Sequence, residues 1–458
     1  MKRRRFAAAM LCFVALAAAS AGLRPAPAAA SVSSTISSIL QKHGVAGGRT
    51  GVYVWDFDAA RQVFAGYADT RLAPASNMKL VTTSSALSGW GPRHRFKTEL
   101  YGPDVPVYEG VLYGDLYLKG FGDPSLSTLS YQREVLHLTT ASFEAFARRL
   151  RTLKVRKVQG SVLGDESWFD VKRGGPTWTP GLQLECGLLS ALSGNESLAN
   201  GNRVQDPATY AAGLLTEALR AKGVKVTGKP GAGKVPETAR LLKQQFSAPL
   251  SALLKRMNKH SDNFFAEIML KGLGKDFNGE GSTRAGLEVS RANLAAMGLD
   301  PASYRLLDGC GLSYENRLTA RDLVRIMGAA RRRFDFDDYY DSLAIAGVDG
   351  TLEDRMRGTA AAGNAHAKTG TLNIAVCLSG YVTSANDRLV GYAILVNGGA
   401  VSWGNATAAQ DDIVAMLAAT SLSGARQIRV TPMLRQHPLS AFAAVNPVGG
   451  FLQAVVQP

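Results

Sequence analysis

The stretch PASNMKLVTTSSALSGWGP occupies residues 74–92 of the chain. Its segment 76–87 contains no Gly or Pro and is rich in apolar residues, and Gly91-Pro92 follows, which predicts a helix with a C-terminal stop. Positions three apart share a helix face, so the Ser76 hydroxyl and the Lys79 amine can touch. The amine can accept the hydroxyl proton only if burial or a nearby cation lowers its own pKa.

Two further motifs follow in order along the chain. Ser261-Asp262-Asn263 connects two apolar stretches with helical spacing. Asn263 offers a donor and an acceptor that suit an amide, and Ser261 can relay a proton to a leaving amine. Lys368-Thr369-Gly370 opens three strand-like segments, 366–372, 374–383 and 388–397, which predict an antiparallel meander.

Taken alone, each motif also has an ordinary structural interpretation. In chain order, these interpretations are a polar helix start, a helix N-cap and an exposed strand lysine. Together they supply a hydroxyl that can be activated, a second hydroxyl beside an amide, and a cation on a strand, which predicts an acyl-transfer site. In this site Lys368 is the cation that lowers the Lys79 pKa. The amides of Ser76 and Thr371 form an oxyanion hole if the two elements abut.

With these motifs the chain resembles the D-alanyl-D-alanine carboxypeptidases and endopeptidases of peptidase family S13, the class C low-molecular-weight penicillin-binding proteins. The resemblance extends from about residue 33 to 419. Further family-like phrases are Phe121-Gly122-Asp123-Pro124, Gly164-Asp165-Glu166-Ser167, Leu189-Ser190-Ala191-Leu192, Asp308-Gly309-Cys310-Gly311-Leu312-Ser313, Asn316-Arg317-Leu318-Thr319 and Gly347-Val348-Asp349-Gly350-Thr351-Leu352.

The resemblance implies a role for each motif and no metal or other cofactor. Ser76 is the acylated nucleophile, Lys79 its general base, and Ser261 with Asn263 the proton relay and amide contact. The residues implied in binding the terminal carboxylate and polarising the carbonyl are Lys368, Thr369, Gly370 and Thr371. Such enzymes cleave the D-Ala-D-Ala end of peptidoglycan stem peptides and often the D-alanyl cross-link to diaminopimelate, and penicillins acylate the same serine.

The chain departs from this family in two places. Members often carry a third domain, but here only a short polar stretch separates Asn195 from Asp206-Pro207, so that domain is expected to be absent. Members also often place an acidic residue near a Trp to receive the diaminopimelate amine. Glu185, which follows Trp178, is the nearest candidate in this chain.

The N-terminus predicts export. Four basic residues, 2–5, precede an apolar run and small residues, which is typical of a secretory signal peptide over residues 1–30 and implies a periplasmic protein without a membrane span. Removing this segment takes away five basic residues, so the formal charge falls from +15 to +10. The later sequence contains no run of basic residues of the kind that binds nucleic acid. A diffuse positive charge instead suits a cell-wall polymer with many carboxylates.

The cysteines and histidines suggest two other chemistries that the sequence does not favour. Cys186, Cys310 and Cys377 remain after the signal peptide, and their odd number and wide spacing are not a disulfide framework. A thiol nucleophile pairing Cys310 with His366 lacks an orienting motif. Six scattered histidines without His-Glu-x-x-His spacing do not indicate a zinc peptidase.

We therefore expect an α+β fold, in which a penicillin-binding or β-lactamase-like domain has an antiparallel sheet flanked by helices and carries an inserted strand-rich domain. The expected parts after the signal peptide are the first catalytic segment at 31–94, the insert at 95–246, the second catalytic segment at 247–420 and a tail of unknown role at 421–458. Segments 50–57 and 62–67 predict an N-terminal hairpin that could complete the sheet of the meander. The insert is expected to contain strands at 97–101, 111–118 and 158–163 and a helix at 207–222. A serine β-lactamase and a non-catalytic wall-binding protein are the alternatives. Glu166, the acidic residue considered as a deacylating base, is not in a recognisable motif for it.

Overall fold

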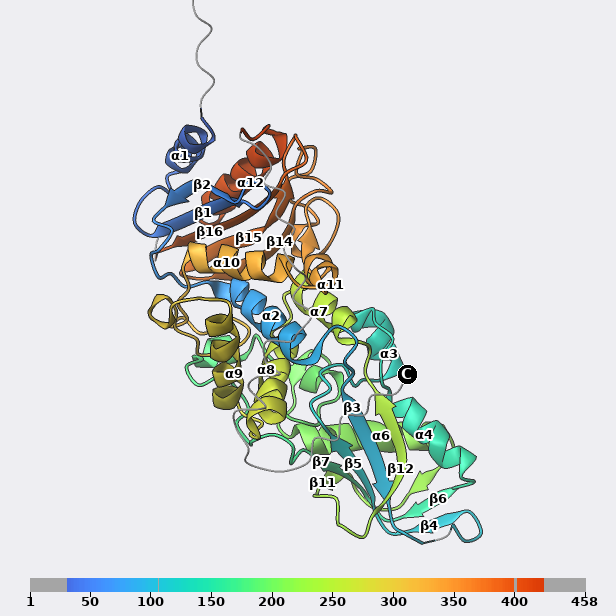
Figure 1. Cartoon of the computed structure of the whole chain (residues 1–458). Coiled ribbons are helices and arrows are strands. Elements are labelled where there is room, and N and C mark those ends of the chain that lie inside the picture. The colour runs from blue at the N-terminus through green and yellow to red at the C-terminus, as the bar shows by residue number, and fades with distance from the viewer. Residues whose placement is uncertain (1–30, 106, 399–401, 424–458) are drawn as a thin grey trace, which may run out of the picture.

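The structure is a computed structural model that describes residues 31–105, 107–398 and 402–423. The predicted signal peptide, and the predicted tail from residue 424 onward, lie outside the described residues. Figure 1 shows two units along the long axis of the molecule: a sheet covered by helices at one end, and the strands of the predicted insert at the other. Helices α8 and α9 lie between this sheet and the strands of the insert.

A six-stranded sheet with the order β13-β14-β15-β16-β1-β2 forms the first unit, and every neighbouring pair is antiparallel. Its strands are β1 (Thr50–Asp56), β2 (Arg61–Gly66), β13 (Ala344–Ile345), β14 (His366–Leu372), β15 (Ala375–Thr383) and β16 (Leu389–Asn397). The predicted meander is confirmed as β14 to β16. The N-terminal hairpin β1–β2 completes the sheet by pairing with β16.

Helices cover both faces of this sheet, as expected for the fold class. Strand β15 shows why, because its side chains alternate: Val376 and Leu378 join the core beneath α1 and α12, whereas Cys377 and Tyr381 join the core with α2 and α10. The helices of this unit are α1 (Val32–Lys42), α2 (Met78–Trp90), α7 (Leu250–Lys259), α8 (Asn263–Asn278), α9 (Thr283–Ala296), α10 (Ala320–Arg331), α11 (Phe336–Asp341) and α12 (Trp403–Ala419).

The second unit begins and ends on neighbouring strands. Strand β3 pairs antiparallel with β12, with Lys97 opposite Phe246, so the chain leaves this unit beside the point where it enters. The predicted boundaries of the insert, 95 and 246, lie at the paired ends of these two strands. The division of the chain into domains stays a prediction. The strands are β3 (Lys97–Gly102), β4 (Val111–Tyr113), β5 (Leu116–Gly120), β6 (Lys157–Gln159), β7 (Val162–Asp165), β8 (Leu198–Ala199), β9 (Asn202–Arg203), β10 (Lys225–Val226), β11 (Gly231–Ala232) and β12 (Arg240–Phe246).

Two predicted strands of the insert, 111–118 and 158–163, are each broken in the structure. The breaks lie at Gly114, which adopts φ 117°, and at Gly160. A Cβ on Gly160 would lie 2.3 Å from the Gly114 carbonyl oxygen, so the two turns are in contact. Each half then joins a different sheet: β5 and β7 the five-stranded sheet, and β4 and β6 the three-stranded one.

Helices pack on these sheets and give the insert a core of its own. The predicted helix 207–222 is confirmed as α6 (Pro207–Ala221), and α4 (Phe143–Thr152) is a second, unpredicted one. The Ser142 hydroxyl caps α4, whose Phe143 and Phe146 are fully buried against α6 and the strands. Two short helices are α3 (Leu129–Tyr131) and α5 (Pro180–Gln183).

The stretch where the family often carries a third domain is short. Between Ser197 and Pro207 the described chain makes the two-residue strands β8 and β9 and then enters α6. Within the described ranges, no helix combines the length and the apolar character that a membrane crossing requires.

We predict that truncating the core of the insert lowers the stability of the protein. Phe146→Ala should reduce the free energy of unfolding by about 3–5 kcal/mol, because the fully buried ring leaves a cavity. The control is Val171→Ala, since Val171 of the same unit is 80% exposed and should change stability by no more than about 0.5 kcal/mol. Chemical denaturation of both variants measures the difference, and equal losses would contradict the assignment of this core.

Candidate active site

Ser76 lies at a strained turn that leads into α2. Ala75 adopts φ 47°, which is unusual for a residue other than glycine, and the 3₁₀ turn η1 (Ala75–Asn77) runs directly into the helix. Lys79 follows in the first turn of α2 and is fully buried. Its Nζ atom lies 3.1 Å from the Ser76 Oγ atom. The structure therefore brings together the hydroxyl and amine that the helical spacing predicted.

Two carbonyl oxygens also hold the Lys79 amine. Its Nζ atom lies 2.7 Å from Asn263 Oδ1 and 2.8 Å from the main-chain oxygen of Cys310. A neutral amine has two N–H groups and one lone pair. If the two carbonyls accept both N–H groups, the lone pair is directed at the Ser76 hydroxyl, as a general base requires.

Burial is the main reason that the pKa of Lys79 is lowered from its ordinary value. The negative charges of Asp262, Asp308 and Glu267 oppose this shift. The cation predicted to assist, Lys368, is also fully buried, and burial and the Lys79 charge both lower its pKa. The Lys79 charge thus acts on the pKa of Lys368, while burial is the cause that lowers the pKa of Lys79. The role of Lys368 in lowering the Lys79 pKa stays a prediction.

The second motif lies in the connection between α7 and α8. Ser261 adopts φ 58°, and its Oγ atom accepts a hydrogen bond of 2.9 Å from Lys368 Nζ. Asp262 points elsewhere and caps α8 through the Phe265 amide, at 3.0 Å. The N-cap reading is therefore right for Asp262, whereas Ser261 and Asn263 both face the lysines.

The third motif, on strand β14, packs directly against the nucleophile turn. The Asn77 side chain donates to the Lys368 carbonyl at 3.1 Å. A Cβ on Gly370 would lie 2.9 Å from the Ser76 amide nitrogen and 3.0 Å from the Pro74 oxygen, so this approach requires glycine. The condition set for an oxyanion hole, contact between the Ser76 and Thr371 elements, is met.

An open cleft of about 580 Å³ lies over these groups. The predicted residues that line it are Ser76, Glu185, Ser261, Asn263, Thr369, Gly370 and Thr371. Lys79 and Lys368 lie fully buried behind this surface. The insert supplies one wall through its segment around α5, and Glu185 there is exposed, while its main-chain oxygen accepts from Asn263 at 2.9 Å.

Several cleft residues were not assigned from the sequence. Thr351 hydrogen-bonds Thr369 through their hydroxyl groups, at 2.8 Å, and lies in the family-like phrase 347–352. Leu312 likewise lies in a family-like phrase, 308–313. Tyr314 and Trp403 also line the cleft, and no local pattern in the sequence marked them.

The alternative nucleophile and base are both held away from such chemistry. The Cys310 thiol is fully buried, which raises its pKa well above the ordinary value, and His366 stacks on Tyr340 with ring centroids 3.9 Å apart. Cys186 and Cys377 are likewise buried and unbridged. Glu166 binds the Arg173 guanidinium at 2.5 and 2.6 Å and is not among the residues that line the cleft.

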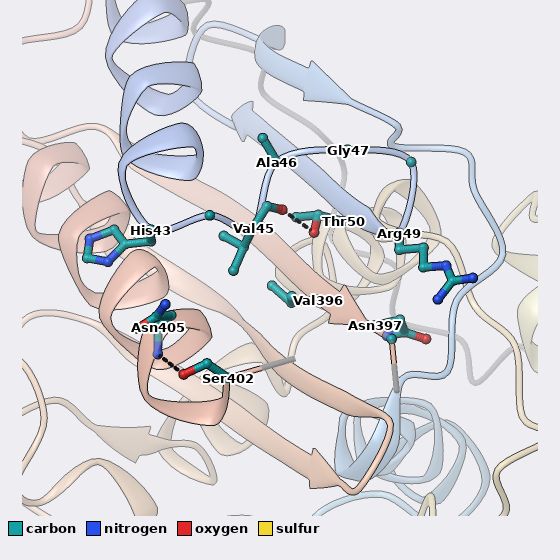
Figure 2. A pocket seen from close by; sticks show the side chains of 13 residues that line it. His43, Val45, Ala46, Gly47, Arg49, Thr50, Val396, Asn397, Ser402 and Asn405 are labelled. Carbon is teal, nitrogen blue, oxygen red and sulfur yellow. Dashed lines mark hydrogen bonds between the residues drawn. The ribbon is translucent and has the colours of Figure 1, made fainter. Parts of the chain in front are cut away.

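A second hollow, of about 400 Å³, lies between the loop after α1 and the start of α12 (Figure 2). Its Ser402 hydroxyl is used to cap α12 through the Asn405 amide, at 3.3 Å. The Thr50 hydroxyl donates to the Val45 carbonyl at 2.5 Å. His43 is paired with Asp412. The described lining residues therefore provide no serine with a lysine base, in contrast to the cleft at Ser76.

We predict that the close approach at Gly370 is needed for reaction at Ser76. Gly370→Ala should slow acylation of Ser76 by up to roughly 100-fold, because the new Cβ displaces β14 from the nucleophile turn. Gly213→Ala is the control, since a Cβ there meets nothing within 4 Å. Rates of covalent penicillin labelling compare the two, and equal rates for both variants would contradict the prediction.

Comparison with known proteins places this geometry in a family. The family model described as D-Ala-D-Ala carboxypeptidase 3 (S13) matches residues 32–185 and 189–420. A D-alanyl-D-alanine carboxypeptidase from Actinomadura sp. is 31% identical, with 79% of this chain and 80% of that protein covered.

Solved structures show the same fold. Penicillin binding protein 4 from Haemophilus influenzae aligns with a TM-score of 0.72 and 20% identity, over 84% of this chain and 99% of that one. A structure of that protein complexed with a novel beta-lactam aligns with a TM-score of 0.63 and 22% identity, over 80% and 94%. From the match along most of its length and the arrangement of its three motifs, the chain belongs to the D-Ala-D-Ala carboxypeptidase 3 (S13) family.

Proposed function

We propose that the protein is a serine DD-peptidase that cleaves the D-Ala-D-Ala end of peptidoglycan stem peptides through an acyl-enzyme on Ser76. The observation that carries the proposal is the 3.1 Å contact between Ser76 Oγ and a buried Lys79 amine whose pKa is lowered. Membership of a family described by this activity, and the name of the Actinomadura relative, support the same conclusion.

Acylation follows from the geometry of the three motifs. Lys79 takes the Ser76 hydroxyl proton while the oxygen attacks the penultimate D-Ala carbonyl. The Ser76 and Thr371 amides stabilise the oxyanion that develops. When the C–N bond breaks, the proton passes from Lys79 to the leaving amine, with Ser261 as the relay. Water then attacks the ester, the Ser76 oxygen regains a proton, and the peptide leaves as a carboxylate.

Binding of the terminal carboxylate is assigned to Lys368 and Thr369. Lys368 Nζ lies 2.9 Å from Ser261 Oγ, and Thr369 lines the cleft beside it. Burial lowers the pKa of Lys368, so a carboxylate at this point provides the opposite charge that favours the protonated amine. The free C-terminus of the stem peptide is thereby selected over an amide or ester.

Cleavage of D-alanyl cross-links is the second activity that we propose for the same serine. It requires a cleft that accepts a diaminopimelate side chain with a free amine. Glu185 is exposed on the cleft wall, which supports its assignment as the amine-binding carboxylate. We further propose that residues 1–30 direct the protein to the periplasm, where peptidoglycan is its partner and β-lactams are covalent inhibitors.

The location of Glu166 weighs against a β-lactamase. In a β-lactamase, a separate base must activate water against the penicilloyl ester. Glu166 is engaged by Arg173 and by the Ser190 hydroxyl, and it does not line the cleft. The cleft carboxylate Glu185 belongs to a wall from the insert rather than to the motifs that surround Ser76.

The central prediction is that Ser76 is the acylated residue. Ser76→Ala should abolish covalent labelling by a fluorescent penicillin and release of D-Ala from muropeptides, while thermal unfolding stays unchanged because the hydroxyl is half-buried and carries little packing. Pentapeptide and cross-linked muropeptides are digested side by side, and mass spectrometry identifies the products. Cross-linked dimers should also yield monomers.

The lifetime of the penicilloyl adduct distinguishes the peptidase from the β-lactamase. The opened ring of penicillin stays tethered and blocks water, so the added mass on Ser76 should persist for minutes while pentapeptide turns over many times. Rapid return to the unmodified mass, with an excess of hydrolysed penicillin, would contradict the peptidase assignment and favour a β-lactamase. Undiminished labelling of Ser76→Ala would remove the assignment of the nucleophile.

The two lysines are predicted to respond differently to the substrate. Lys79→Ala should slow acylation by roughly 10²- to 10⁴-fold with every substrate, since the proton acceptor is lost. Lys368→Ala should chiefly impair peptides with a free carboxylate and spare an amidated or esterified terminus in relative terms. Steady-state rates on matched peptide acids and esters measure this, with the half-exposed Lys255→Ala as control. Equal losses for both variants on both substrates would show that the two roles are not separate.

A further inference from the structure

Glu267 is a fully buried carboxylate that the reaction steps above do not use. It lies on α8 one turn after Asn263, so the two side chains share a helix face. Its Oε1 atom accepts hydrogen bonds from the Gly309 and Cys310 amides, both at 2.7 Å. The carbonyl of the same Cys310 accepts from Lys79 Nζ at 2.8 Å.

From this arrangement we propose that Glu267 is a positioning residue for Lys79. It holds the Gly309–Cys310 segment so that the Cys310 carbonyl meets the amine, and its negative charge acts on the protonation of that amine. The proposal rests on the proposed function, because it assigns a task within the acylation of Ser76. Besides Ser76, Lys79 contacts Asn263 and the Cys310 carbonyl. One face of α8 then positions both contacts, because it carries Asn263 itself and Glu267, which holds Cys310.

Asp308 holds the other side of this loop, so that Glu267 and Asp308 fix Cys310 from its two sides. Asp308 accepts from the Gly311 and Ser313 amides, at 2.8 and 2.6 Å, and from the side chains of Asn316 and Trp178, at 2.7 and 2.8 Å. The Gly311 bond holds the peptide unit whose Cys310 carbonyl meets Lys79, so Asp308 fixes Cys310 on its C-terminal side. The amide of Cys310 is bound by Glu267 alone among the described residues, so removing that acceptor frees the N-terminal side of the residue whose carbonyl holds Lys79.

Close packing explains why a small movement of this loop matters. Gly311 adopts φ 96°, and a Cβ there would lie 1.9 Å from the Ala75 carbonyl oxygen, so the loop touches the strained turn that carries Ser76. The Thr82 hydroxyl on α2 donates to the Gly309 oxygen at 2.6 Å. The loop is thus wedged between α8 and α2, and Glu267 sets its position from the α8 side.

The charge of Glu267 is balanced between two opposing effects. Burial and the nearby Asp308 charge raise the pKa of Glu267 to about 7, while the Cys310 side chain and the Gly309 and Cys310 amides favour the ionised form. Its Oε2 atom has no hydrogen-bond partner among the described residues. The titratable groups that act on Glu267 or feel its charge come from four segments and are Lys79, Cys186, Lys271, Asp308 and Cys310.

A metal ion is a less suitable explanation for this cluster. Glu267, Asp308 and Cys310 place a potential ligand atom each within 4.8 Å of one another. Both Asp308 oxygens are already acceptors for four N–H groups, and Glu267 Oε1 accepts two more. Three of the four carboxylate oxygens, all except Glu267 Oε2, are therefore directed at protein donors, which agrees with a positioning role.

The test is the pH dependence of acylation in Glu267→Gln, which keeps the shape and one acceptor but removes the charge. Above its own pKa of about 7 Glu267 is ionised and favours the protonated amine, so the loss of its charge should lower the pKa of Lys79 in that range and move the acid limb of the acylation rate to lower pH by roughly one unit. The rate constant for penicillin labelling of Ser76, measured by intact mass from pH 5 to 9, gives the profile. The control is Glu217→Gln on the exposed face of α6, which should leave the profile unchanged.

The outcomes separate this proposal from the proposed function. If wild type is not acylated at Ser76, the proposed function fails. If wild type is acylated and Glu267→Gln loses rate equally at all pH values with an unmoved acid limb, the residue is merely structural and the proposal is overturned. Glu267→Asp is the second variant in case Gln does not fold: it should keep the acid limb and lose rate at least tenfold, because a shorter side chain cannot reach both amides, and an unchanged rate would overturn the proposal.

Discussion

Burial of the Lys79 amine without a directly bonded carboxylate is the constraint on which the site depends. Among the described residues no salt bridge involves Lys79, and its three polar neighbours are a hydroxyl and two carbonyl oxygens. A carboxylate in direct contact would hold the proton on the amine and prevent it from acting as a base. The chain instead keeps its acids at a distance, with Asp308 and Glu267 bonded to main-chain amides.

Two strained backbone positions lie where this environment is assembled. Ala75 and Ser261, the residues that present the nucleophile and the relay, both have positive φ without being glycine. Such conformations cost of order 1–3 kcal/mol each and persist only where the surroundings fix them. Here the surroundings are the three close approaches at Gly311, Gly370 and the Asn77 side chain, which join the loop, the strand and the helix around one hydroxyl.

The parts of this structure that follow from side-chain pattern could be predicted from the sequence. The helix after Ser76, the β14–β16 meander and the hairpin that completes its sheet all rest on local periodicity, and each is confirmed. The broken strands of the insert could not, since the contact between Gly114 and Gly160 joins segments distant in sequence. The helix α4 was missed although Ser142 and the buried Phe143 and Phe146 gave a cap and a helical apolar pattern.

The same distinction applies within the site. Ser76 and Lys79 are marked by their spacing in one helix, and the other motifs by residue types that the chemistry needs. The contact of Lys79 with the Cys310 carbonyl spans 231 residues and uses a main-chain atom, which any residue type would supply. Glu267 binds the amide of that same residue, so its place in the site becomes visible only when the loop is seen in three dimensions.

Two buried lysines in one site also imply a division of charge. The Lys79 charge lowers the pKa of Lys368, and burial disfavours both charges, so one proton is easier to hold than two. In the proposed function, the substrate carboxylate approaches Lys368 and favours the proton there. The repulsion that follows keeps Lys79 neutral at the moment when Ser76 must lose its proton, so binding the correct terminus prepares the base.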